Sequence, residues 1–142
     1  MSFISNKNKI LIFDTETTGF PKSYRNSADI VQEILQLAMI DGEGRTRFNE
    51  MFKPERISTW ASAQRVHGIS PDMVEGKDSA RTFRKEIQGI IDEADLLVAY
   101  NFAFDQIFLR SIGISFVGKQ YFDVMKVFAQ QHGSPVGVML HC

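Results

Sequence analysis

The sequence has almost no cysteine, no excess of charge of either sign and no long apolar run. Its one cysteine, Cys142, is the last residue, so no disulfide can form within the chain. The 16 Lys and Arg nearly balance the 17 Asp and Glu, which excludes a broad cationic surface for nucleic acid. The longest apolar run, residues 96–100, is too short to span a membrane, and residues 1–7 do not form the apolar core of a signal peptide. We therefore expect a cytoplasmic protein with no membrane partner.

The length of 142 residues predicts one domain, because domains usually contain about 100–200 residues. Apolar residues make up 44% of the chain and charged residues 23%, which excludes a disordered or collagen-like chain. The sequence has no internal repeat and no linker that would divide two domains. We therefore expect a single domain over residues 1–142.

Apolar runs and turn residues predict three strands in the first half of the chain. Lys9–Phe13 is a short apolar run that ends where residues 14–21 bring in Gly and Pro. Glu33–Ile40 and Arg45–Phe52 are the next two strand candidates, and the Asp-Gly-Glu-Gly segment between them is a good hairpin turn. Residues 60–76 show only loops and short helical pieces.

The second half alternates between helical and extended patterns. A helix is expected to begin at Ser79, followed by a buried strand over Asp95–Asn101. The apolar stripe of residues 102–112 predicts another helix. A short strand at Gln120–Phe122 and a helix over Val124–Gln131 complete the pattern. Together the elements indicate a mixed α/β domain.

Asp14 and Glu16 are the first candidates for chemistry. Residues two apart in an extended backbone point to the same side, so both carboxylates can face one point. Two such anions repel each other unless a cation lies between them, and oxygen ligands without Cys or His favour Mg²⁺ or Mn²⁺. An isolated Asp-x-Glu pair is more often a solvated turn, but here it follows a buried strand directly.

Asp105 is the second candidate. It lies in the first turn of the helix expected after the strand that ends at Asn101, where backbone N–H groups favour a charged carboxylate. That strand could neighbour the Lys9–Phe13 strand and so bring Asp105 near the first pair. The alternatives are an ordinary Asp at a helix start and, for Asn101, a plain N-cap.

These residues together resemble a known family. Phe13–Gly19 (FDTETTG) and Asn101–Asp105 (NFAFD) resemble the first two motifs of the DnaQ-like (DEDD) 3′→5′ exonucleases, which include the proofreading subunit of bacterial DNA polymerase III and oligoribonuclease-type enzymes. Val66–Asp72 (VHGISPD) resembles the His-Gly-Ile segment of the proofreading branch. The resemblance covers most of the chain, from about residue 9 to residue 130.

The resemblance implies a ribonuclease-H-like fold, a mixed sheet flanked by helices, and two-metal hydrolysis of phosphodiester bonds at nucleic-acid 3′ ends. By position, Asp14, Glu16 and Asp105 would be catalytic ligands of Mg²⁺ or Mn²⁺. The residues that would hold the terminal nucleotide, partly by base stacking on the aromatic ring, are Thr17, Thr18, Gly19, His67, Asn101 and Phe104.

The chain departs from the family at the third motif, where a general-base His is followed five positions later by a fourth carboxylate. His132 has Gly137 at that distance, and His67 with Asp72 has the spacing but lies between the first two motifs. Asp123 matches a common family Asp that is not a metal ligand. Residues 133–142 are expected to be irregular, so C-terminal helices of the family would be missing, by truncation, by a divergent end or in a naturally short variant.

Three functions stay open at this stage. The first is a 3′→5′ exonuclease, impaired because the general base and fourth carboxylate are not found. The second is a catalytically deficient module that binds nucleic acid or a protein partner, and the third and weakest is a Mg²⁺-dependent phosphatase. The expected partner is a single-stranded DNA or RNA 3′ end, together with a polymerase, and an uncovered apolar patch would favour self-association.

Overall fold

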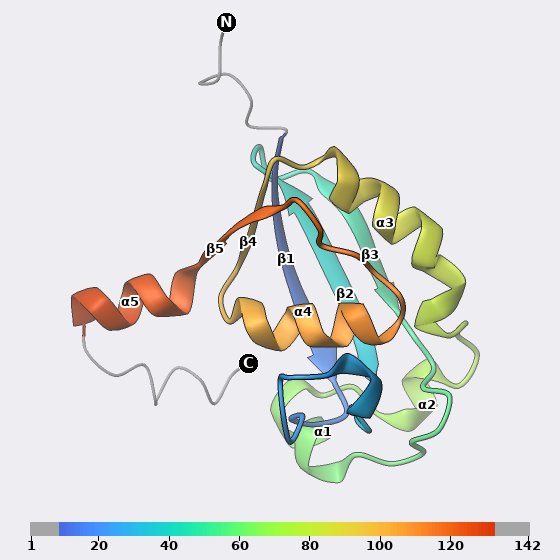
Figure 1. Ribbon diagram of the computed structural model, residues 1–142. Coiled ribbons are helices and arrows are strands. Elements are labelled where there is room, and N and C mark those ends of the chain that lie inside the picture. The colour runs from blue at the N-terminus through green and yellow to red at the C-terminus, as the bar shows by residue number, and fades with distance from the viewer. Residues whose placement is uncertain (1–8, 133–142) are drawn as a thin grey trace, which may run out of the picture.

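A computed structural model of the protein describes residues 9–132 and contains one five-stranded sheet (Figure 1). The strands are β1 (Ile10–Thr17), β2 (Ile34–Asp41), β3 (Thr46–Met51), β4 (Leu96–Ala99) and β5 (Gln120–Asp123), in the order β3-β2-β1-β4-β5. β1, β2 and β3 pair antiparallel, whereas β4 and β5 extend the sheet in parallel. The central position of β1 places its last residues beside the start of both β2 and the helix that follows β4.

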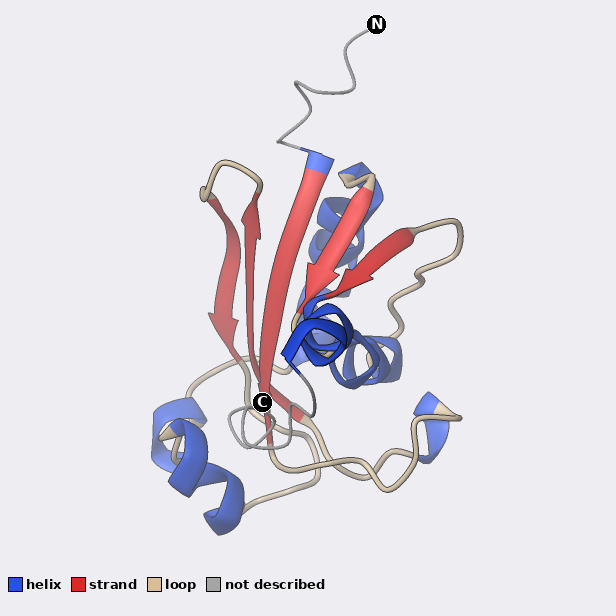
Figure 2. Cartoon of the chain, turned by 90° about the vertical axis from the view of Figure 1, so that its left-hand side faces the viewer, coloured by secondary structure: helices blue, strands red, loops and turns tan. Residues whose placement is uncertain are grey.

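Helices flank this sheet. They are α1 (Ala61–His67), α2 (Pro71–Val74), α3 (Arg84–Glu93), α4 (Phe102–Ser111) and α5 (Val124–His132), with short 3-10 turns η3 (Ser27–Asp29) and η4 (Ala80–Phe83). Figures 1 and 2 show α3 and α4 on one face of the sheet, with α1 below its lower end. None of the helices in residues 9–132 is long and apolar enough to cross a membrane.

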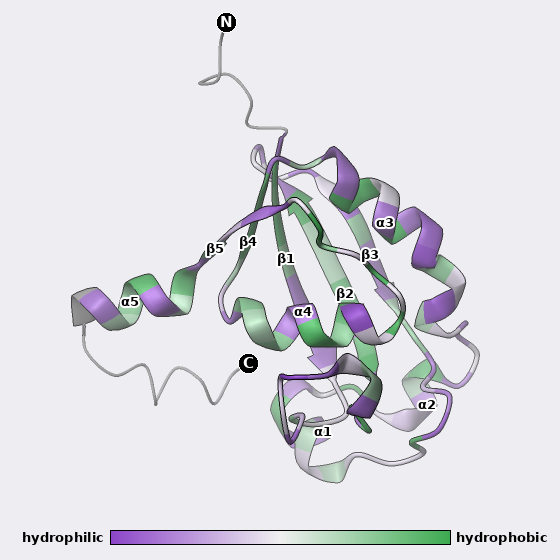
Figure 3. Ribbon diagram, viewed as in Figure 1, coloured by the Kyte–Doolittle hydropathy of each residue, from purple (hydrophilic) through white to green (hydrophobic). Residues whose placement is uncertain are grey.

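The main core lies between the sheet and the two helices on its face. Leu11 and Phe13 of β1 are buried there with Ile87 and Ile91 of α3, and the ring of Phe13 meets that of Phe102 of α4 edge to face. Figure 3 shows the same pattern, since β1 changes from hydrophobic to hydrophilic along its length. The apolar half of β1 anchors the strand, and its polar half lies at the lower end of the sheet.

The structure confirms the strand and helix order predicted from the sequence; most boundaries shift by one or two residues, and two differ by more. β1 does not end at Phe13 but continues to Thr17, because pairing with β2 extends as far as Thr17 opposite Ile34. The helix predicted from Ser79 begins as the 3-10 turn η4 and becomes α3 at Arg84. The irregular segment expected over residues 133–142 lies outside the described residues.

Candidate active site

Asp14 and Glu16 occupy alternate positions near the end of β1. Phe13 and Thr15 are buried, so Asp14 and Glu16 take the other set of alternating positions along β1. Burial raises the pKa of Asp14. Burial, and then the charge of Asp14, raise the pKa of Glu16 to about 7. The predicted pair therefore shares one face, and ionising both groups is costly.

Asp105 lies in the first turn of α4 and is only 4% exposed. Its Oδ1 accepts hydrogen bonds from the Thr15 backbone N–H at 3.3 Å and from the Thr15 hydroxyl at 2.5 Å. Burial, together with the charges of Asp14 and Glu16, outweighs these two bonds and raises the Asp105 pKa to about 8. Folding thus joins residues 90 positions apart, and burial of Asp105 favours its protonated form.

The three carboxyl groups interact electrostatically without forming one compact cluster. Asp105 contacts β1 at Thr15, the residue between Asp14 and Glu16 in the strand, and forms no hydrogen bond with either of them. Within residues 9–132, no three Asp, Glu, His or Cys side chains are close enough together to hold one metal ion. The assignment of Asp14, Glu16 and Asp105 as joint metal ligands therefore stays a prediction.

The start of α4 is held by Asp123 at the end of β5. One Asp123 oxygen accepts the Phe102 N–H at 3.3 Å and the other accepts the Met125 N–H at 3.0 Å, so this carboxylate serves the first turns of both α4 and α5. Asn101 precedes α4 and is 8% exposed, but its side chain makes no capping hydrogen bond. Asn101 therefore occupies the predicted N-cap position of α4, and its backbone carbonyl, not its side chain, accepts the first helical N–H groups, from Phe104 and Asp105.

Thr17, Thr18 and Gly19 form a tight segment after the two carboxylates. The Thr17 hydroxyl donates to the Gly19 carbonyl at 2.9 Å, and the Thr18 hydroxyl donates to Gln32 Oε1 at 2.6 Å. A Cβ at Gly19 would lie 3.1 Å from the Gln32 side chain, so a larger residue would press on that side chain. A side chain at position 19 would therefore require Gln32, which holds the Thr18 hydroxyl, to shift.

Both ring nitrogens of His67 are engaged within the protein. Nδ1 accepts the Ile69 N–H at 3.1 Å, so the ring proton lies on Nε2, which donates to the Thr17 carbonyl at 2.9 Å. In this arrangement neither nitrogen is open to accept a proton from water. His67 therefore supports the Thr17 backbone, and the structure agrees with rejecting His67 and Asp72 as the missing third motif.

A small pocket of about 40 Å³ opens beside Glu16. Of the predicted nucleotide-binding residues, it is lined by Thr17, Gly19, His67 and Phe104, but not by Thr18 or Asn101. Asp14 and Asp105 do not line it either. The pocket therefore joins one predicted catalytic carboxylate to four of the six predicted binding residues.

The exposed aromatic ring at this pocket belongs to Phe20, which the sequence interpretation missed. Phe104 is only 3% exposed, because its ring packs against Phe20 at 5.5 Å and Phe108 at 5.0 Å. Phe20 is 59% exposed and Val66, which also lines the pocket, is 57% exposed. The signal for Phe20 was its place directly after the Thr-Thr-Gly segment. Phe20 presents the more accessible ring for a nucleobase.

Comparison with known proteins points the same way. The RNase_T exonuclease family model matches residues 11–131. The DNA polymerase III subunit epsilon of Buchnera aphidicola subsp. Schizaphis graminum (strain Sg) is 28% identical over 110 residues, which are 75% of this chain and 46% of that protein. The chain thus spans about half the length of this curated relative.

Solved structures share the fold. Exonuclease X, solved in complex with 5′ overhanging duplex DNA, superposes with a TM-score of 0.59 at 21% identity, over 87% of this chain and 64% of the other. A 3′-exonuclease solved in 3′-end specific recognition of a histone mRNA stem-loop gives a TM-score of 0.61 at 16% identity, over 92% and 65%. These likenesses confirm the predicted ribonuclease-H-like sheet with flanking helices.

Proposed function

Because the chain belongs to the RNase_T family of exonucleases, we propose that it removes nucleotides from nucleic-acid 3′ ends by a mechanism that uses two divalent metal ions. The observation that carries this proposal is the pairing of Thr15 with Asp105, which brings together two motifs 90 residues apart. It couples the charge of Asp105 to those of Asp14 and Glu16, beside a small pocket lined by four of the residues predicted to hold the nucleotide.

The donor chemistry of these residues fits Mg²⁺ or Mn²⁺. Asp14, Glu16 and Asp105 offer only oxygen atoms, and their mutual repulsion would be relieved by a divalent cation. Bound metal ions would favour ionisation of the attacking water and stabilise charge on the leaving 3′ oxygen. The Thr15 hydroxyl and amide hold one Asp105 oxygen and so limit how this carboxylate turns.

The terminal nucleotide would lie over the mouth of the pocket next to Glu16, which at about 40 Å³ is too small to enclose it. The exposed ring of Phe20 offers a stacking face, and Val66 adds apolar contact. His67 keeps the Thr17 backbone in place and is not the general base, because both of its nitrogens are engaged. Asp123 positions the first turn of α4, which carries Asp105.

A specific observation favours a second candidate, a catalytically deficient module that binds nucleic acid or a protein partner. Within the part of the chain that the structure describes, His67 has both ring nitrogens engaged and offers none to act as a base. Loss of general-base catalysis alone slows hydrolysis by about 10²–10⁴-fold. We therefore expect weak Mg²⁺ or Mn²⁺ binding and slow hydrolysis by the 142-residue chain.

The test is digestion of a 5′-labelled single strand of DNA or RNA, measured once with Mn²⁺ and once without any divalent metal. Slow, metal-dependent shortening from the 3′ end, lost in Asp14→Asn and kept in the exposed control Asp78→Asn, would support the proposal. Fast digestion that depends on Asp14 would contradict the need for a third-motif base. A chain that binds neither the metal nor the oligonucleotide would refute both candidate functions.

DNA and RNA are both retained as substrates, since the two solved relatives are described with duplex DNA and with an mRNA stem-loop. The polymerase subunit relative supports a polymerase as protein partner, which co-purification with a replicative polymerase would test. We also propose a cytoplasmic location, to be checked by cell fractionation.

Self-association is proposed through the edge strand β5. β5 ends the sheet, and its Tyr121 and Phe122 are 53% and 44% exposed. An edge strand with exposed aromatic residues can pair with a second copy of the chain. Light scattering that gives only the monomer mass across a dilution series would contradict this proposal.

A further inference from the structure

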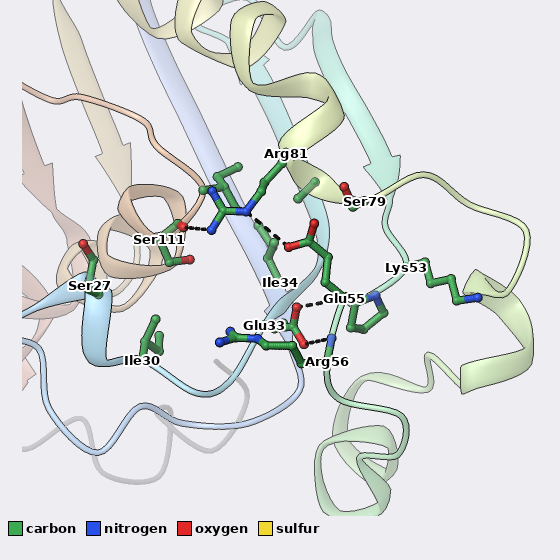
Figure 4. A pocket seen from close by; sticks show the side chains of 14 residues that line it. Ser27, Ile30, Glu33, Ile34, Lys53, Glu55, Arg56, Ser79, Arg81 and Ser111 are labelled. Atoms are coloured by element: carbon green, nitrogen blue, oxygen red, sulfur yellow. Dashed lines mark hydrogen bonds and ion pairs between the residues drawn. The ribbon is translucent and has the colours of Figure 1, made fainter.

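Glu33 lies immediately before β2, between the Thr17–Gly19 segment and the loop that follows β3. Its side chain lines a cavity of about 110 Å³, separate from the pocket beside Glu16 (Figure 4). The sequence interpretation included Glu33 only as the first residue of a strand. Its contacts connect elements that carry the proposed active site.

The backbone of Glu33 holds Thr18 in both directions. The Thr18 N–H donates to the Glu33 carbonyl at 2.9 Å, and the Glu33 N–H donates to the Thr18 hydroxyl at 2.9 Å. The same hydroxyl donates to Gln32. Thr18 is therefore fixed to residues 32–33 through its amide and its side chain, and its neighbours Thr17 and Gly19 line the nucleotide pocket.

The Glu33 carboxylate is held by three consecutive backbone N–H groups. One oxygen accepts from Glu55 at 2.8 Å, and the other accepts from Arg56 at 2.9 Å and Ile57 at 2.8 Å. A carboxylate in a row of amide donors makes charge-assisted hydrogen bonds, which are stronger than neutral ones. An amide side chain of the same size cannot reproduce them, because its NH₂ group would face an N–H donor.

The same loop is tied to the helix that carries Asp105. The Arg81 guanidinium lies 3.2 Å from the Glu55 carboxylate and donates to the Ser111 carbonyl, in the last turn of α4, at 3.0 Å. Figure 4 shows Arg81 between Glu55 and Ser111 at this cavity, with the Glu33 carboxylate beside the backbone of Glu55 and Arg56. One loop thus connects the Thr18 segment with α4.

We propose that Glu33 is a positioning residue of the active site: by anchoring residues 55–57 it holds Thr18, and through Thr18 it holds the walls of the nucleotide pocket. The proposal rests on the proposed nucleic-acid binding, since the pocket walls matter only where a terminal nucleotide enters. Glu33 itself touches no substrate, so its effect is on substrate affinity through the backbone.

The experiment compares the full 142-residue chain with Glu33→Gln and Glu33→Asp. Glu33→Gln removes the charge at constant size, and Glu33→Asp keeps the charge but shortens its reach. Glu50→Gln is the matched control, because it makes the same change of a carboxylate to an amide at an exposed residue of β3. Amide hydrogen exchange at Thr18 and at residues 55–57 is measured by NMR, and the Kd for a single-stranded oligonucleotide is measured in Mn²⁺.

We expect both Glu33 variants to raise exchange at Thr18 and residues 55–57 by about 10-fold or more, and to raise the Kd by about 10-fold, as loss of charge-assisted hydrogen bonds predicts. Glu50→Gln should change neither quantity. Unchanged amides in the β1–β2 ladder, including that of Leu37, would show that the variants are folded.

Three results would overturn the proposal. Unchanged exchange at Thr18 would show that Glu33 does not hold the segment. Faster exchange at Thr18 with an unchanged Kd would show that the segment does not control binding. A Glu33→Asp variant that binds the oligonucleotide like the parent would show that the charge suffices and that the reach of Glu33 to residues 55–57 is not required. If the parent chain binds no oligonucleotide, the proposed function fails first and the positioning role fails with it.

Discussion

Replacing Asp105 by Asn is expected to stabilise the metal-free protein at neutral and alkaline pH. Asp105 is buried, and its pKa of about 8 means that the folded protein holds a proton that the unfolded chain has already lost. Asn resembles the protonated acid, and its carbonyl oxygen can accept the same two hydrogen bonds from Thr15. The variant therefore keeps the contacts and avoids the buried charge.

The sign and size of the effect follow from proton binding. The folded pKa is raised above the ordinary value of 3.8, so between about pH 4 and pH 8 the folded state binds more protons than the unfolded state. The free energy of unfolding of the parent then falls as pH rises, by at most about 1.4 kcal/mol per pH unit for one group. Part of the shift comes from the charges of Asp14 and Glu16. We therefore expect Asp105 to lower the free energy of unfolding by about 2–4 kcal/mol between pH 4 and pH 8.

Thermal unfolding of both proteins in EDTA across pH 4–9, followed by circular dichroism, measures this difference. A change of 2–4 kcal/mol corresponds to a Tm difference of about 6–15 °C at the alkaline end for a chain of this size. At the acid end the two Tm values should converge. Adding Mn²⁺ should raise the Tm of the parent more than that of the variant, since Asn is a poorer ligand than a carboxylate.

Two results would refute this reasoning. A variant less stable than the parent at pH 8 would show that the Asp105 carboxylate is stabilised by the fold when ionised. A parent Tm that does not fall between pH 4 and pH 8 would show that the burial penalty is compensated in the metal-free protein. Asp78→Asn, on the surface, is the control and should follow the parent at every pH.

Three further predictions concern other parts of the molecule. Phe20→Ala should weaken binding of a single strand by about 5–100-fold in fluorescence anisotropy, with little change in Tm, because the ring is 59% exposed; unchanged affinity would contradict base stacking there. Trp60→Phe removes the indole donor to the buried Ile69 carbonyl at 2.7 Å and should lower the free energy of unfolding by about 1–3 kcal/mol in urea titrations; a smaller loss would mean that the carbonyl finds another donor. Burial disfavours ionised Asp41, but hydrogen bonds from Arg45 outweigh this penalty and lower the Asp41 pKa. Asp41→Asn should therefore lower the Tm at pH 7, and the difference from the parent should disappear as the pH falls below the Asp41 pKa. An equal loss of Tm at pH 2 and pH 7 would exclude this electrostatic origin.

The strands and the carboxylate motif could be predicted from the sequence, because they depend on local periodicity. Apolar runs at residues 10–13 and 96–99 predict buried strands, and their parallel pairing in the sheet brings Asp105 near Asp14 as expected. The sequence did not predict where β1 ends. Gly19 and Pro21 suggested an early stop, whereas the extension to Thr17 depends on pairing with a strand that begins at Ile34.

The α/β order, the Asp-x-Glu pair at alternating strand positions and the exonuclease motifs can therefore be read from the amino-acid order, since these are properties of neighbouring residues. The environment of each group depends on how the chain folds. The fold buries Asp105 against Thr15, engages both nitrogens of His67, leaves Phe20 exposed over the pocket and places Glu33 in a row of backbone amides. Burial and hydrogen-bond partners come from residues far apart in the chain, and no local pattern encodes them.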